Sequence, residues 1–200
     1  MQHSLVALLF VAVWVCGSAV SGGTQTMNPP SLPPETKAPP QTGAPVKDPV
    51  ATALRTLLPR FRSNILGAIT EMPADKFNYK PTPDQMTFAH LLVHTIGSNN
   101  MLCAKVADIA PPKVEELKET DSKAKLLAAA TASFDFCGEA LGKMDDSKLG
   151  DSVDVFGGGR QYPRAMAALG LASGWADHYG AAAMYLRLNG ILPPSAQPKK

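Results

Sequence analysis

Three of the four histidines occupy positions from which they could share a metal ion. His90 and His94 are four residues apart, which is about one helical turn, so both imidazoles would project from the same helix face. Two imidazoles at that spacing can bind one metal, and His178 would add a third nitrogen if its helix packs against theirs. Three histidines with an open position form a catalytic type of zinc or nickel site. The alternative is that these are separate histidines, hydrogen-bonded or at the surface, with no metal.

Cysteine chemistry is the second possibility. Of the three cysteines, Cys16 lies in a predicted signal peptide, which leaves Cys103 and Cys137. In an oxidising compartment an even pair predicts a disulfide. The alternative is two separate buried thiols, because a free cysteine packs as a small apolar residue. Spacing supports no Ser-His-Asp arrangement, so catalysis stays unassigned.

The first 48 residues are predicted to export and tether the folded part. An apolar run over residues 5–16 is followed by Ala19-Val20-Ser21, which fits the small-x-small cleavage rule, so residues 1–21 are predicted to be a signal peptide. A retained membrane anchor is the alternative, because no Lys or Arg precedes the apolar run. Residues 22–48 are proline-rich and predicted to be a disordered linker. The expected location is secreted or periplasmic, with no stable membrane insertion after cleavage.

Hydrophobic periodicity predicts four amphipathic helices within one domain, residues 49–195, followed by a tail, residues 196–200. The helices are expected at about residues 49–71, 87–108, 121–144 and 163–188. Pro59 should kink or split the first helix, and Pro163 should open the last. Residues 145–161 contain Gly157-Gly158-Gly159 and are expected to form a flexible loop or a short hairpin. Long connections favour an all-α four-helix bundle with crossover loops over a simple up-and-down bundle.

Charge excludes one class of partner. The net charge is +2, and the basic residues are scattered rather than clustered, so no nucleic-acid binding is expected. The partner is expected to be a small molecule or a protein. Oligomer formation is left open.

Two segments of the chain resemble a known family. Residues 74–84 (ADKFNYKPTPD), with Thr87-Phe88 and His94, resemble the segment between the first and second helices of DinB-like proteins. Residues 178–180 (HYG), 185–191 (YLRLNGI) and Pro193-Pro194 resemble their final helix, and the two cysteines resemble those of exported members. The resemblance covers about residues 50–195.

This resemblance implies a four-helix bundle of unusual topology that holds a divalent metal on three histidines. One ligand would come from the second helix and two from the fourth, spaced His-x-x-x-His. Some relatives use such a site in thiol-dependent transferase chemistry. The ligand of the second helix maps onto His94, and the second ligand of the fourth helix maps onto His178.

The sequence departs from the family pattern at two positions. The residue four before His178 is Gly174, and Ala181 replaces a usual glutamine. Asp177 should point about 100° away from His178 and is a poor substitute ligand. One interpretation is therefore an incomplete metal site in a non-catalytic or weakly metal-binding module. The other is a metal-dependent hydrolase or transferase in which His90 replaces the missing ligand beside His94 and His178.

Overall fold

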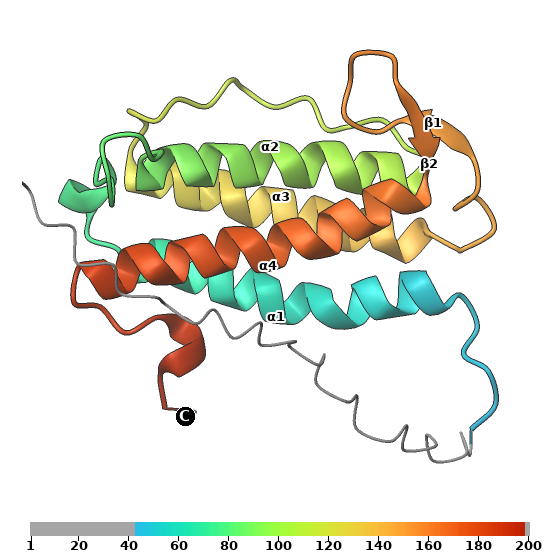
Figure 1. Ribbon diagram of the computed structural model, residues 1–200, viewed down its shortest axis with the longest axis horizontal. Helices are drawn as coiled ribbons and strands as arrows, with labels where there is room; N and C mark the ends of the chain where they lie inside the picture. The colour runs from blue at the N-terminus through green and yellow to red at the C-terminus, as the bar shows by residue number, and fades with distance from the viewer. Residues whose placement is uncertain (1–42, 199–200) are drawn as a thin grey trace, which may run out of the picture. The chain divides into compact units, whose positions relative to one another are not determined.

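Long helices and one short hairpin make up the described part of the chain, residues 43–198 of the computed structural model (Figure 1). By its contacts the chain divides near Gly43 into two units, and all of these elements belong to the second. The predicted signal peptide and most of the predicted linker lie outside the described residues. Within those residues no helix is both long and apolar enough to span a bilayer. The elements in chain order are α1 (Pro49–Glu71), η1 (Ala74–Lys76), α2 (Phe88–Ala107), α3 (Lys123–Lys143), β1 (Ser152–Asp154), β2 (Gln161–Pro163), α4 (Ala165–Leu188) and η2 (Pro194–Ala196).

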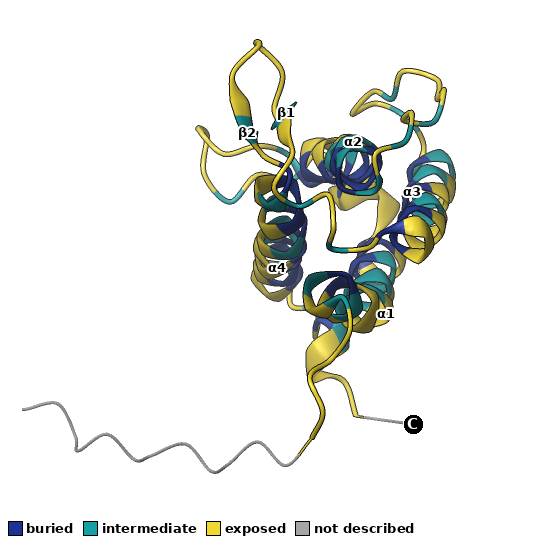
Figure 2. Cartoon of the chain, turned by 90° about the vertical axis from the view of Figure 1, so that its right-hand side faces the viewer, coloured by how far each residue is buried: buried dark blue, intermediate teal, exposed yellow. Residues whose placement is uncertain are grey.

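The four long helices form a ring in which α1 lies diagonally opposite α2, and α3 lies diagonally opposite α4 (Figure 2). α1 packs against α3 and α4, and α2 packs against the same two helices (Figure 2). α1 and α4 run in one direction along the bundle, and α2 and α3 run in the other (Figure 1). Because α2 and α3 are parallel neighbours, the chain must return along the whole bundle between them, which residues 108–122 do. We call residues 108–122 the crossover segment. The predicted bundle with a crossover connection is confirmed.

Two expectations about prolines, that Pro59 could split the first helix and that Pro163 would open the last, are not met. α1 is not split, because it continues from Pro49 to Glu71 through Pro59. Pro59 is exposed while Leu54 and Ile65 on either side are buried, so tertiary packing of both halves outweighs the lost backbone hydrogen bond. Pro163 does not open α4, because it pairs with Ser152 in the β1–β2 hairpin and α4 begins two residues later. The hairpin is one of the two forms expected for the glycine-containing loop.

The N-terminal end of α1 is capped by a side chain from a distant part of the chain. α2 and α3 carry their own N-cap hydroxyls, Thr87 and Ser122. α1 has no such cap, and instead the Asp146 carboxylate accepts hydrogen bonds from the backbone N–H groups of Val50 and Ala51, at 2.8 and 2.9 Å. This carboxylate satisfies the N–H groups of Val50 and Ala51, which have no partner within the helix, and it complements the positive end of the helix dipole.

Loss of the Asp146 carboxylate is expected to destabilise the bundle. Asp146→Ala should lower the free energy of unfolding by about 1–2 kcal/mol, the usual effect of removing an N-cap side chain. Asp145→Ala is the matched control, because the Asp145 carboxylate bonds only to Ser147 within the described residues, and it should cost less than about 0.5 kcal/mol. Urea unfolding curves give both values. Equal losses in the two variants would show that Asp146 does not cap α1.

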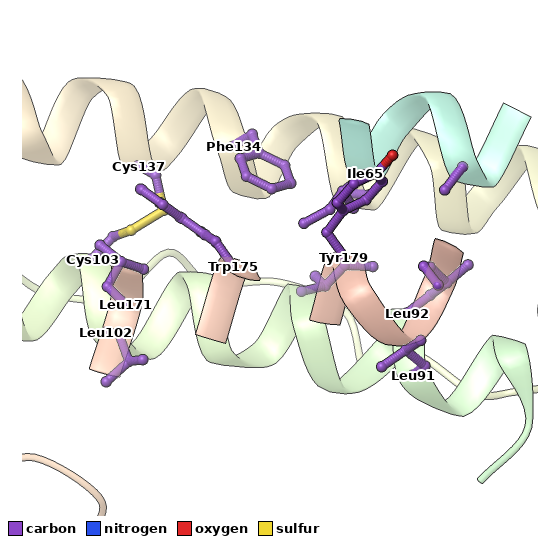
Figure 3. Packing of buried hydrophobic residues seen from close by; sticks show 14 of the residues in the cluster. Ile65, Leu91, Leu92, Leu102, Cys103, Phe134, Cys137, Leu171, Trp175 and Tyr179 are labelled. Carbon is purple, nitrogen blue, oxygen red and sulfur yellow. A yellow bond between two sulfur atoms is a disulfide. The ribbon is translucent and has the colours of Figure 1, made fainter. Parts of the chain in front are cut away.

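The core contains a polar network as well as apolar side chains. Trp175 Nε1 donates to Asn99 Oδ1 at 2.9 Å, and Asn99 Nδ2 donates to Ser133 Oγ at 3.1 Å. All three residues are buried, so these bonds pair groups that would otherwise be costly to desolvate. Cys103 and Cys137 form a disulfide between α2 and α3, with their Cα atoms 5.2 Å apart (Figure 3). The predicted bridge, rather than two separate thiols, is confirmed.

Candidate functional site

His94 of α2 and His178 of α4 meet at the contact between these two helices. Their ring centroids are 4.9 Å apart and their planes are nearly perpendicular, at 82°. His94 is exposed and His178 is half-buried, because both lie at the edge of the α2–α4 contact rather than in the core. The structure thus brings together the two residues that the family resemblance indicates as ligands.

The two imidazoles line a cavity of about 390 Å³. The turn before α2 also lines this cavity, and the Tyr185 hydroxyl ties the turn to α4 by donating to Met86 O at 2.6 Å. Tyr185 is a site residue that was not predicted from the sequence. Tyr185 follows His178 by seven residues, which is two helical turns, so both side chains lie on one face of α4. This spacing could have identified Tyr185 as a site residue. The lining residues are Asp84, Gln85, Met86, Leu91, His94, Asp177, His178, Ala181, Met184 and Tyr185.

Gly174 lies one helical turn before His178 and faces the same imidazole. A Cβ atom built at Gly174 would lie 3.6 Å from His178 Cε1, which is ordinary van der Waals contact. A side chain at this position would therefore start beside the His94–His178 pair. Glycine leaves that space without a ligating group.

His90 is held away from this pair by the crossover segment. Its Nδ1 is 2.7 Å from Glu119 Oε1, and Thr87 Oγ1 donates to Glu119 Oε2 at 2.6 Å. The hydrogen bonds from Thr87 and His90 hold the pKa of the Glu119 carboxyl below its usual range. His90 does not line the cavity. The structure therefore brings together two of the three predicted metal ligands and not the third.

The charge state of His178 follows from burial and from its neighbours. Burial lowers its pKa most, and the positive charge that His94 can carry lowers it further. Asp177 acts in the opposite direction. Asp177, which helical spacing predicts to lie about 100° from His178, lines the same cavity. The net effect favours the neutral imidazole, which has a free nitrogen lone pair near neutral pH.

The pKa of His178 can be measured directly. In an NMR pH titration it should titrate below its usual value of about 6.5. His94→Ala should raise the pKa, because it removes a like charge and opens the site to water. The unfolded chain binds a proton at His178 more tightly than the folded protein does. The contribution of His178 to the free energy of unfolding is therefore full above about pH 6.5 and is lost as pH falls. A His178 pKa at or above 6.5 in the unmodified protein would contradict this description.

The residues present do not complete a three-histidine metal centre. A catalytic zinc site normally has three protein ligands and one open position. Across residues 43–198, no three His, Cys, Asp or Glu side chains are grouped so that they could hold one ion. His94 and His178 supply two nitrogens, and the position from which a third would come is Gly174.

Comparisons with known proteins agree with this architecture. The sequence profile of the DinB superfamily matches residues 57–180. No curated protein matches the chain. A DinB-like protein from Bacillus subtilis superposes with a TM-score of 0.57 at 17% identity, covering 74% of this chain and 99% of its own. A DinB-like protein from Bacillus cereus superposes with a TM-score of 0.58 at 15% identity, covering 72% of this chain and 95% of its own.

At these identities the two crystal structures establish similarity of fold and nothing further. The family profile is the stronger finding, because it spans α2, α3 and most of α4 and includes both His94 and His178. The chain belongs to the DinB superfamily.

Proposed function

We propose that this chain is an exported DinB domain that acts as a non-catalytic binding module with a reduced, weakly metal-binding site. The proposal rests on the contact of His94 with His178, whose ring centroids are 4.9 Å apart, beside Gly174. The DinB superfamily often binds metals, and here the position beside His178 has no side chain. Two neutral imidazoles can hold zinc or nickel only loosely, because a tight site needs further protein ligands.

Export is the second part of the proposal. Its support is the apolar N-terminal run with a small-x-small cleavage sequence and the disulfide between Cys103 and Cys137. Disulfides persist in oxidising compartments and are rare in the cytosol. A secreted or periplasmic location follows, and the ligand of the module is a small molecule or a protein.

The competing function is a metal-dependent hydrolase or transferase that uses His90 as the third ligand. It would require His90 to leave Glu119, to which its Nδ1 is bonded at 2.7 Å, and to reach the cavity one turn away. The geometry favours the two-histidine module. A zinc titration distinguishes it from the metal-dependent enzyme.

Zinc should be titrated into untagged protein with NMR detection of the histidine ring signals. The proposal expects shifts at His94 and His178, with a Kd weaker than about 1 μM, and loss of both shifts in His94→Ala. His90→Ala should bind zinc as the unmodified protein does. Nanomolar binding that His90→Ala abolishes would overturn the proposal in favour of the metal-dependent enzyme.

A further inference from the structure

The crossover segment covers two cavities that adjoin each other beside α2. One, of about 380 Å³, lies between α2, α3 and the crossover segment, and we call it the α3-side cavity. The other, of about 470 Å³, lies between α2, the β1–β2 hairpin and the crossover segment, and we call it the hairpin-side cavity. Asn100 of α2 and Val114 of the crossover segment line both. Neither cavity shares a lining residue with the histidine site.

The crossover segment packs loosely over this part of α2 and α3. None of its residues is buried, and Ile109, Pro112 and Leu117 are among the few that are partly buried. Val114 is 62% exposed, although it lines both cavities. The segment returns along the bundle without a helix or strand of its own (Figure 1). A ligand can therefore enter beneath it without separating the four helices.

Apolar side chains form most of the walls of both cavities. Met101, Ile109 and Val153 line the hairpin-side cavity. In the α3-side cavity the small side chains of α3 leave space beneath the crossover segment. The volume of each cavity lies within the range of small-molecule sites. The apolar lining of the α3-side cavity includes Ile96, Val114, Leu117, Ala129, Ala132 and Phe136.

One charged side chain in these walls has no partner of opposite charge. In the α3-side cavity Lys125 lies 3.1 Å from Glu115, and in the hairpin-side cavity Arg164 lies 3.0 Å from Asp108. Lys105 also lines the hairpin-side cavity and forms no ion pair within the described part of the chain. It is partly exposed, so its ammonium group is accessible. The lining side chains alone therefore carry one unpaired positive charge.

The two cavities follow α2 over a length that sets the size of a ligand. Ile96 lines the α3-side cavity, and Lys105 lines the hairpin-side cavity. These residues are nine positions apart, so they lie about 14 Å apart along the helix axis. An extended chain of about twelve carbon atoms, with C–C bonds of about 1.5 Å, has the same length.

We propose that the two cavities together bind one fatty acid, with its carboxylate at Lys105 and its acyl chain beneath Val114. The chain packs along Met101 and Ile96 and ends beside Phe136. Burial of the chain supplies most of the affinity, because each methylene group removed from water contributes about fourfold. The unpaired cation favours an acid over an uncharged alcohol. Because the other two cations keep their own carboxylate partners, one carboxylate is enough.

Saturated fatty acids of increasing length are the probes, titrated into the full chain below their micellar concentrations and followed by calorimetry and NMR. From hexanoate to dodecanoate the affinity should rise about two- to fourfold with each methylene group, at one molecule per chain. It should level off beyond about twelve carbons. NMR shifts are expected at Ile96, Met101 and Val114. Affinity that does not depend on chain length, or shifts centred on Leu91 and Met184 of the histidine site, would overturn the proposal.

A second copy of the chain is the alternative occupant of this surface. Sedimentation of the protein without ligand would show such a dimer. A dimer that covers the crossover segment and excludes dodecanoate would overturn the proposal as well.

The carboxylate contact is tested with decanoate and decanol. Decanol should bind the unmodified protein about 2–5-fold more weakly, the usual effect of one partly exposed ion pair. Lys105→Met should remove this preference and leave decanol binding unchanged. Lys113→Met is the matched control, because Lys113 is an exposed lysine of the crossover segment that lines neither cavity. An equal preference for decanoate in both variants would contradict the contact with Lys105.

A second pair of variants locates the acyl chain. Ala132→Phe places a large side chain in the α3-side cavity and should weaken dodecanoate binding at least tenfold, while hexanoate, which fits the hairpin-side cavity alone, should bind as before. Ala124→Phe is the control, because both alanines are exposed on α3 and Ala124 lines neither cavity. Dodecanoate binding that Ala132→Phe leaves unchanged would refute the assignment of the chain to this cavity.

Discussion

Removing the disulfide should lower the free energy of unfolding by about 4 kcal/mol, the value expected from chain entropy for a loop of this length. Cys103 and Cys137 are 34 residues apart in sequence and join α2 to α3, the parallel neighbours linked by the crossover segment. Without the bridge, the unfolded chain gains all the conformations that this closed loop excludes. The measurement is urea unfolding of the oxidised protein and of the double variant Cys103→Ala/Cys137→Ala.

Reduced unmodified protein is the control for packing, because it keeps both sulfur atoms in the core and loses only the bond. Its stability should fall by most of the same amount, and the double variant should be insensitive to reductant. A difference of less than about 1 kcal/mol between oxidised and reduced protein would mean that the disulfide does not constrain the unfolded chain in the expected way.

Gly174→His should convert the histidine pair into a tight metal site. The new imidazole would start one turn before His178, from a Cβ atom 3.6 Å from that ring, and would supply the third nitrogen beside His94. Changing a residue that merely supports a metal ligand alters affinity by about 10–100-fold, so adding a ligand should raise zinc affinity more than about 100-fold. Calorimetric titration at neutral pH, with one zinc per chain, measures the gain.

Gly174→Ala is the control for the helix itself. It adds the Cβ atom without an imidazole, and it should raise stability by about 0.5–1 kcal/mol while leaving zinc affinity unchanged. If Gly174→His binds zinc no more tightly than Gly174→Ala, the geometry of the His94–His178 pair is wrong for a shared metal.

The helices and the bundle topology could be predicted from the sequence because both depend on local patterns. Apolar residues of α2 and α3 recur every three or four positions, and the long connection between them favours a crossover. The pairing of Cys103 with Cys137 was predictable from an even number of cysteines in a chain predicted to be exported. Pro163 was assigned to the wrong element because its partner in the hairpin, Ser152, precedes it by eleven residues.

The features that could not be predicted from the sequence all depend on contacts between distant elements. Asp146 caps a helix almost a hundred residues away, and Glu119 holds His90 from the crossover segment. Helical spacing placed Asp177 on another face than His178, but both line one cavity because the cavity is wide enough to include two adjacent faces.

The metal content of the untagged protein, purified from its native compartment and measured by mass spectrometry, tests the central claim most directly. Because His94 and His178 are the two imidazoles that meet within residues 43–198, much less than one zinc or nickel per chain should remain after dialysis. One tightly held metal ion per chain, lost in His94→Ala, would contradict the assignment of a reduced site.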